Sequence, residues 1–197
     1  MNALRTLIVP LVALAVLSGC DSMPWNKDKK HDDTKKMANE SEKVAVAEIA
    51  PAAAAATQPS WGKPAGAITF TQMDDKVHVT GEITGLAPGK HGIHIHEKGD
   101  LSDPGLMSTG GHYNPDKHVH GGPTTSPVHA GDFGNITADD SGKATLDLTV
   151  DDLSVGGAKN DVVGKALIIH AKEDDLSSQP SGNVGARIGG GVIEMQK

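Results

Sequence analysis

The feature that most constrains this chain is a dense run of metal-ligand side chains between residues 94 and 132. In four short blocks, five histidines and one aspartate lie among glycines and prolines, in a chain of 197 residues with 10 histidines in all. The blocks are His94-Ile95-His96, Gly110-Gly111-His112-Tyr113-Asn114-Pro115, His120-Gly121-Gly122-Pro123 and His129-Ala130-Gly131-Asp132. Imidazole and carboxylate groups at this density suit copper or zinc. The stretch therefore predicts a metal site, for which the rest of the chain supplies the scaffold.

The remaining pattern favours short strands joined by turns. Aromatic residues make up only 3% of the chain, whereas glycine occurs 24 times. Alternating or apolar runs predict strands at residues 43–49, 66–72, 76–84, 90–97, 134–138, 143–150, 164–171 and 187–194. Residues 51–59 are alanine-rich and predict a loop, because nine residues between prolines are few for an isolated helix.

Two long connections, residues 99–130 and 172–185, have little strand character. Long loops of this kind in a compact domain are usually functional or disordered, and histidines in the first favour a loop ordered by metal. The fold class predicted is all-β: an eight-stranded Greek-key β-sandwich or flattened barrel with two long functional loops.

The first 42 residues predict delivery to a membrane surface. A positive start precedes an apolar run at residues 7–17, which is too short to span a bilayer but suits a signal peptide. The run ends in Leu17-Ser18-Gly19-Cys20, which resembles the lipobox of bacterial lipoproteins. That resemblance implies a signal peptide at 1–19, a lipidated Cys20 with a flexible tether at 20–42, and a folded domain at 43–197. The alternative is an ordinary signal peptide with an incidental cysteine. Lipidation of Cys20 would place the domain on the extracytoplasmic side, in the cell envelope or periplasm, anchored to the membrane.

Charge and cysteine content exclude other classes. The formal net charge is -7 and no block of lysine and arginine occurs, which argues against nucleic acid as a partner. Cys20 is the single cysteine, so an intrachain disulfide is impossible.

Spacing alone gathers seven candidate ligands. His94 and His96 are two apart on a predicted strand and therefore point to the same face. The full set assigned to one or two metals is His94, His96, His112, His120, His129, Asp132 and His170. Four nitrogens suit Cu(II), whereas three histidines and a carboxylate suit tetrahedral zinc. Two four-coordinate metals would have to share one of these seven residues, and the alternative is loop histidines left free in solvent.

At this level of detail the chain resembles copper/zinc superoxide dismutase, over roughly residues 43–194. The resemblance is carried by several blocks that follow one another in the same order as in the family. They are Gly92-Ile93-His94-Ile95-His96-Glu97, Gly111-His112-Tyr113-Asn114-Pro115, His120-Gly121-Gly122-Pro123, Gly131-Asp132-Phe133-Gly134-Asn135, Ile169-His170, Asp174-Asp175-Leu176 and Gly182-Asn183-Val184-Gly185-Ala186-Arg187.

The resemblance implies a role for each matching residue. The copper ligands would be His94, His96, His112 and His170. The zinc ligands would be His112, His120, His129 and Asp132. His112 would thus be shared, and would also carry a proton during the reaction. Asp174 would hydrogen-bond ligands of both metals, and Arg187 would attract and dock the substrate, superoxide. The implied activity is conversion of superoxide to dioxygen and hydrogen peroxide by alternate reduction and re-oxidation of a copper ion, with a structural zinc ion.

Three other histidines are predicted to lie outside the ligand set. His118 competes with His120 for one zinc position, but the block Gly121-Gly122-Pro123 matches the family at His120, so His118 is expected to face solvent. His91 falls on the opposite strand face from His94 and is expected to support or pack. His78 is expected to be an ordinary strand residue.

The main departure from the family is its disulfide, whose two positions match Leu106 and Gly190 here. Loss of a native disulfide costs about 2–5 kcal/mol in small secreted domains. We therefore expect the zinc loop, residues 112–132, to take over the anchoring and the metal-free protein to be weak. Since the family's disulfide often braces a dimer, its absence favours a monomer over a homodimer. The rival functions are a non-catalytic envelope copper/zinc-binding protein and a surface module with a structural zinc; the full ligand set and Arg187 disfavour both.

Overall fold

The computed structural model describes residues 43–197. The expected signal peptide at 1–19, Cys20 and the tether at 20–42 lie outside the described residues. In the part of the chain that is described, no helix has the length and apolar character needed to cross a membrane.

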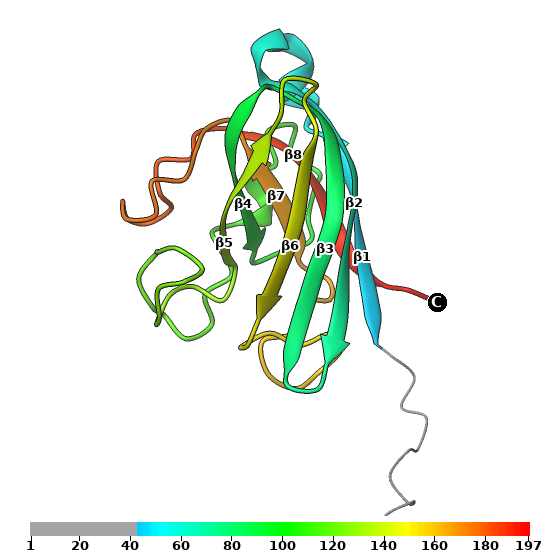
Figure 1. Ribbon diagram of the computed structural model, residues 1–197, viewed down its shortest axis with the longest axis vertical. Coiled ribbons are helices and arrows are strands. Elements are labelled where there is room, and N and C mark those ends of the chain that lie inside the picture. Colours follow the sequence, from blue (N-terminus) through cyan, green and yellow to red (C-terminus); the bar gives the residue numbers. More distant parts are fainter. Residues whose placement is uncertain (1–42) are drawn as a thin grey trace, which may run out of the picture. The chain divides into compact units, whose positions relative to one another are not determined.

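Eight antiparallel strands form one sheet that curls into a nearly closed barrel (Figure 1). Its order is β5-β4-β7-β8-β1-β2-β3-β6, so β3 pairs with β6, β4 with β7 and β1 with β8. These pairings between strands distant in sequence give a Greek-key arrangement and confirm the predicted all-β class. The strands are β1 (Val44–Pro51), β2 (Gly62–Met73), β3 (Lys76–Leu86), β4 (Gly89–His96), β5 (Asp132–Ala138), β6 (Ala144–Val150), β7 (Ala166–His170) and β8 (Arg187–Met195).

Strand β2 begins four residues before the predicted start at residue 66. The added residues include Pro64, and proline cannot donate a hydrogen bond to a neighbouring strand. In the structure the pairing of β2 with β3 shifts register between Gly62 and Ala65, and Pro64 lies within this irregularity. Proline is tolerated at such bulges, so the strand continues through it.

Strands β4 and β7 are buried on both faces, which is what positions the candidate site. Every residue from His91 to His96 and from Ala166 to His170 is buried. Ile93, Ile95, Leu167 and Ile169 belong to the barrel's main core. Side chains alternate between faces along a strand, so His94 and His96 of β4 and His170 of β7 lie on the outer face. They are nevertheless shielded from water, because loops cover that face.

A second, smaller apolar cluster lies on this outer face of β7. It consists of Ala52, Ala55, Leu106, Ala166 and Ile168, with Trp61 and Leu101 packed against it. The alanine-rich segment, residues 51–59, supplies two of these residues. The sequence predicted a loop there, and the structure differs. The segment forms the short 3-10 helices η1 (Ala53–Thr57) and η2 (Pro59–Trp61), the cyan turns at the top of Figure 1. Its prolines do prevent a long α-helix, but its short turns bury two of its alanines, Ala52 and Ala55.

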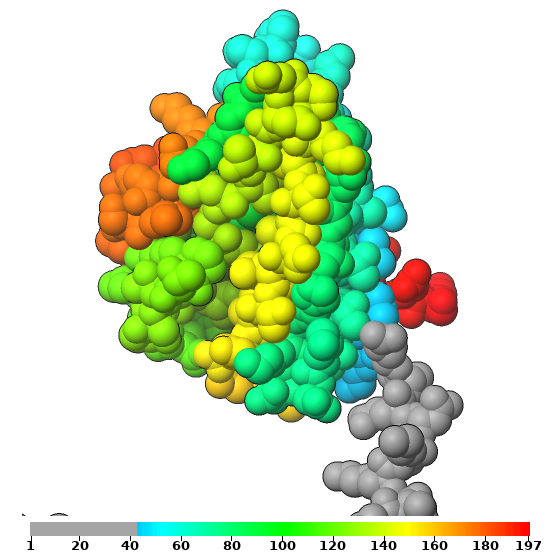
Figure 2. Space-filling view, viewed as in Figure 1, coloured from blue at the N-terminus to red at the C-terminus, as the bar shows by residue number. Residues whose placement is uncertain are grey.

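The two predicted long loops are present and lie on one flank of the barrel. The first spans residues 97–131 and contains only the turn η3 (Met107–Thr109); the second spans residues 171–186. The space-filling view shows the second loop, in orange, packed beside part of the first, in yellow-green (Figure 2). Both loops reach the outer face of β4 and β7, where the histidines lie.

Candidate metal centre

Four imidazoles converge over the outer face of the antiparallel pair β4 and β7. His94 and His96 come from β4, and His170 is the last residue of β7. His112 arrives from the first loop through an isolated bridge to His96. The ring centroids lie 4.0 Å apart for His94 and His112, 5.1 Å for His94 and His170, and 5.5 Å for His96 and His170. His94, His112 and His170 each offer a ligand atom within 4.8 Å of the others. Nε2 of His96 lies 3.4 Å from Nε2 of His170. We name this set the β4–β7 group.

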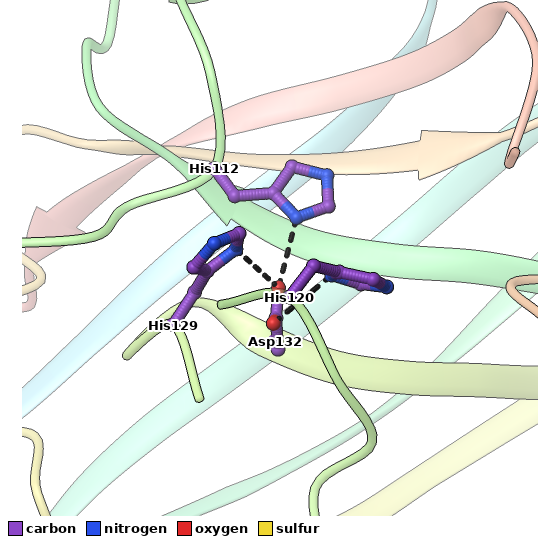
Figure 3. A group of neighbouring side chains, drawn as sticks. All are labelled: His112, His120, His129 and Asp132. Carbon is purple, nitrogen blue, oxygen red and sulfur yellow. Dashed lines mark hydrogen bonds and ion pairs between the residues drawn. The ribbon is translucent and has the colours of Figure 1, made fainter. Parts of the chain in front are cut away.

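A second group gathers around the carboxylate of Asp132, the first residue of β5. His112, His120 and His129 point their Nδ1 atoms at its two oxygens, at 2.8, 3.0 and 3.2 Å (Figure 3). All four residues are buried, and their ligand atoms lie within 4.8 Å of one another. Three imidazoles and one carboxylate are the donor set of a tetrahedral zinc site. We name this set the Asp132 group; His112 belongs to both groups.

Asp174 in the second loop joins the two groups. Its buried carboxylate accepts hydrogen bonds from Nε2 of His94 at 2.8 Å and Nε2 of His120 at 3.0 Å. Asn135 on β5 fixes the backbone of Asp174 from both sides: its amide donates to the Asp174 carbonyl, and its side-chain oxygen accepts from the Asp174 N–H. Because a carboxylate only accepts, each imidazole places its proton on Nε2 and keeps a lone pair on Nδ1.

Unpartnered nitrogens show that these donor sets fit cations. In the described residues, five buried side-chain atoms lack a hydrogen-bond partner, and four of them belong to histidines: His94 Nδ1, His112 Nε2, His120 Nδ1 and His170 Nδ1. The most informative is Nδ1 of His120. In the neutral ring this atom bears a lone pair, yet it lies 3.0 Å from an oxygen of Asp132. Two acceptors in such contact inside a protein call for a cation between them.

Arg187, the first residue of β8, stands beside the β4–β7 group. Its guanidinium donates to the Leu106 carbonyl at 2.7 Å, the Thr109 hydroxyl at 2.8 Å and the Gly110 carbonyl at 2.8 Å. It lines a cavity of about 260 Å³ together with His96, His112 and His170. Burial lowers the pKa of Arg187 from its usual value, although the group stays cationic near neutral pH. The cavity therefore combines imidazole nitrogens with a fixed positive charge, which suits a small anion.

Comparison with known proteins identifies this arrangement. A family profile described as "Copper/zinc superoxide dismutase (SODC)" matches residues 64–193. The chain belongs to this family. It is 45% identical over 136 residues, 65% of this chain and 74% of the relative, to "Extracellular superoxide dismutase [Cu-Zn]" of Drosophila melanogaster. A solved structure, "Crystal Structure Analysis of the clock protein EA4", is similar with a TM-score of 0.68 and 40% identity, covering 79% of this chain and 96% of that chain.

As a copper/zinc superoxide dismutase, the chain is an oxidoreductase that converts superoxide to dioxygen and hydrogen peroxide, with copper and zinc as the family's cofactors. The histidine and aspartate groups described above are able to hold such ions. Family membership also confirms the function predicted from the ordered blocks of sequence.

Burial sets the electrostatics of the dismutase's histidines. It lowers the pKa of His94 and His170 far below the ordinary value, and the neighbouring imidazoles lower it further. Burial also lowers the pKa of His96 to about 3. Neutral imidazoles are the form that binds metal, so these rings are prepared for it at neutral pH. Burial acts to raise the pKa of Asp132, but hydrogen bonds from His112 and the Gly121 N–H outweigh it and keep the carboxyl ionised.

The three remaining histidines of residues 43–197 lie outside both groups. His118 is exposed, and Asn114 holds its backbone from both sides. His91 is buried beneath the site and hydrogen-bonds the carbonyls of His170 and Ala87. His78 lies on β3 and contacts Asp147. None of the three belongs to either group of candidate ligands.

Sequence reasoning missed two polar residues that hold the site together. Gln179 of the second loop accepts from the backbone N–H of His120 at 2.8 Å and donates to its carbonyl at 2.9 Å. Asn135 fixes Asp174 in the same two-sided way. Asn135 follows Asp132 in a block that matches the family, which was a usable signal, whereas nothing near Gln179 marks it in the sequence.

Proposed function

We propose that the β4–β7 group binds copper and the Asp132 group binds zinc, with His112 shared between them. The observation that carries this assignment is the position of His112. Its Nδ1 faces Asp132 at 2.8 Å and its Nε2 is buried without a partner, and His112 also offers a ligand atom within 4.8 Å of those of His94 and His170. One imidazole thus offers a nitrogen to each group, as seven ligands for two four-coordinate metals require.

Copper, when bound, supplies the one-electron redox chemistry that superoxide dismutation needs, and zinc supplies a fixed positive charge. The chain's own residues supply position. Asp174 fixes the orientation of one ring in each group, and the Gly110 carbonyl fixes a third by accepting from Nδ1 of His96 at 3.0 Å. Because that bond places the proton of His96 on Nδ1, the lone pair of the ring is on Nε2, where it can bind a metal.

His112 is the proposed proton carrier. Its Nδ1 is committed to the Asp132 group, so Nε2, whenever it is not bound to copper, is the atom that can hold a proton and pass it to reduced superoxide. Nε2 belongs to a residue that lines the cavity, where the anion would enter. Hydrogen peroxide formation consumes two protons for each superoxide reduced, and this nitrogen is placed to deliver one of them.

Arg187 is the proposed docking group for superoxide. The formal net charge of -7 would repel an anion on average, so attraction has to come from local charge. Between His170 and Arg187 the second loop carries one other cation, Lys172. Arg187 is half-buried at the cavity and held by three acceptors, so its charge is fixed where the anion would bind.

We further propose that the enzyme is extracytoplasmic and anchored through a lipidated Cys20, and that it is a monomer. The lipobox-like sequence supports the anchor, and the relative from Drosophila melanogaster is named as extracellular. Expression of the wild type and of Cys20→Ser in a bacterium fed labelled palmitate tests the anchor. Label and membrane association should be lost in the variant; label in Cys20→Ser would contradict lipidation.

The assay that tests the metal and catalytic assignments compares three proteins. The wild type, His112→Ala and the exposed-histidine control His118→Ala are loaded with copper and zinc, analysed for metal content and assayed for superoxide dismutation. We expect the control to match the wild type, and His112→Ala to lose activity and to bind both metals more weakly. Two bound metals without dismutation in the wild type would favour the rival reading, a non-catalytic copper/zinc-binding protein.

A further inference from the structure

The position of Arg187 depends on one short turn of the first loop. All three hydrogen bonds from its guanidinium end on residues 106–110, at the Leu106 carbonyl, the Thr109 hydroxyl and the Gly110 carbonyl. We name these three acceptors the cradle. Guanidinium is a rigid planar fork, so its place follows the acceptors that hold it. The cradle also touches the β4–β7 group, because the Gly110 carbonyl accepts from His96.

Leu106 holds the cradle in a conformation that a leucine seldom adopts. Its backbone is left-handed, with φ 60 and ψ 22, where a side chain crowds the following carbonyl. In this conformation its carbonyl accepts from Arg187, from the Thr109 hydroxyl and from the Thr109 N–H. Strained residues of this kind persist only where the surroundings enforce them, and they gather at functional sites.

What enforces it is the second apolar cluster. The Leu106 side chain is only 6% exposed and packs with Ala52, Ala55, Ala166 and Ile168. Ile168 precedes His170 by two residues on the same face of β7, so the cluster lies directly beside the β4–β7 group. Opposite Ile168 on β8 stands Gly190, and a Cβ placed there would lie 3.5 Å from Leu106 Cδ1. The leucine therefore covers the glycine, and its burial outweighs the strain in its backbone.

The alanine-rich segment packs in this cluster and is hydrogen-bonded both to the first loop and to β8. Its Ala54 N–H donates to the carbonyl of Pro104, two residues before Leu106, at 2.8 Å. Its Ala52 N–H donates to the carbonyl of Ile188, the residue after Arg187, at 2.8 Å. One short segment thus links the turn that accepts from Arg187 to the strand that carries it.

We propose that Leu106, locked by the alanine-rich segment, is a positioning residue that holds the Arg187 charge where a substrate anion docks. It acts without touching the anion itself. This proposal rests on the proposed copper site and on the docking role of Arg187. It assigns a positioning function to residues 52–57 and to Leu106. Their apolar side chains would otherwise be explained by packing alone.

The probe is azide, a small monoanion that binds Cu(II), titrated into the copper- and zinc-loaded protein and followed by the visible copper spectrum. Leu106→Ala removes the packing. Leu106→Met keeps the volume and should behave as the wild type. Leu146→Ala is the matched control, since Leu146 is a leucine 7% exposed in the main core on β6.

We expect Leu106→Ala to weaken azide binding about two- to tenfold, the value of one net hydrogen bond, with the spectrum before azide unchanged. Leu146→Ala should lower the melting temperature but leave azide affinity as in the wild type. In an Arg187→Ala background, Leu106→Ala should have no further effect, because the charge it positions is gone. If Leu106→Ala does not hold metal, Ile168→Val thins the same cluster and should weaken azide binding to a smaller degree.

Wild-type azide affinity in Leu106→Ala, or an equal loss in Leu146→Ala, would overturn the positioning role while leaving the proposed function intact. Unchanged azide affinity in Arg187→Ala would instead remove the docking role, and the Leu106 proposal with it. A further loss on adding Leu106→Ala to Arg187→Ala would also overturn it, because the leucine would then act by another route.

Discussion

Replacement of Asp174 by asparagine is the sharpest perturbation of the metal centre. The two side chains have the same shape, but an amide offers one acceptor where the carboxylate offers two. In the wild type one oxygen accepts from Nε2 of His120 and from the Leu176 N–H, and the other accepts from Nε2 of His94. Asp174 is only 1% exposed, so water cannot replace a lost acceptor.

Either orientation of the amide leaves a buried N–H facing another donor. If the amide oxygen stays with His120, the amide nitrogen faces Nε2 of His94. If the amide is flipped, its nitrogen faces Nε2 of His120 and the Leu176 N–H. An unsatisfied buried donor costs about 1–3 kcal/mol. The ring can escape only by moving its proton to Nδ1, which removes the lone pair that would bind metal. We therefore expect at least one of the two metals to bind about 10–100-fold more weakly in Asp174→Asn.

Competition with a coloured chelator, run separately for copper and zinc, measures the effect. The matched control is Glu173→Gln, which removes the same charge one residue earlier, from a side chain 54% exposed and paired with Lys90. Such surface pairs contribute little, so both metals should bind the control normally. Wild-type affinities in Asp174→Asn would refute the argument. Equal losses in the control would show that the effect comes from the lost negative charge and not from the lost hydrogen bond. Which metal weakens in Asp174→Asn reports the orientation of the amide.

Three further outcomes follow from the same geometry. Burial lowers the pKa of His96 from 6.5 to about 3 in the metal-free protein. Between these two pH values the unfolded chain binds one more proton than the folded chain, so the free energy of unfolding falls as pH drops through that window. At pH 5 the loss from His96 alone is about 2 kcal/mol, which urea unfolding of chelator-treated protein at pH 7 and 5 measures; equal stability would contradict it. Arg187→Ala should lower kcat/KM and flatten its dependence on salt, and an unchanged slope in stopped-flow assays would place steering elsewhere. Removal of both metals should lower the melting temperature by about 10 °C or more, so a metal-free form nearly as stable as the loaded one would refute metal-dependent anchoring.

The sequence was most informative where residue type carries the chemistry. The candidate ligands could be found because histidine and aspartate recur in short blocks, and His94 and His96 share a face because strands alternate. Strand periods predicted all eight strands with small errors at their ends. The pairing of His112 with both groups did not come from spacing, which demanded only that some residue be shared; it came from resemblance to the family.

What could not be predicted depends on contacts between distant segments. Residues 51–59 follow local rules that exclude a long helix, but their sequence does not reveal that Ala52 and Ala55 are buried against Leu106. Gln179 lies in a polar loop and becomes structural only because His120 lies opposite. The burial of residues 91–96 of β4 and of all of β7 likewise results from loops that cover an outer face. In each case the deciding partner is far away in the chain.

The apolar cluster changes what the missing disulfide implies for the first loop. The proposed zinc ligands would anchor residues 112–132, whereas Leu106 and the alanine-rich segment anchor residues 104–110, and the two supports share no side chain. Loss of metal should therefore free one part of the loop and leave the other. In the metal-free protein we expect rapid amide hydrogen exchange at Gly121, whose N–H donates to Asp132, and continued protection at Lys98, whose N–H donates to the Thr109 carbonyl.

Hydrogen-exchange mass spectrometry of peptides from residues 97–111 and 112–131, with and without zinc, measures the two parts separately. Protection lost only in the second peptide would show that packing holds the cradle by itself. Simultaneous loss in both would show that zinc anchors the entire loop, as expected from the sequence, and that the cluster is too weak to act alone. Because Arg187 depends on the first part only, the former result also predicts that zinc-free, copper-loaded protein still binds azide through a correctly placed guanidinium.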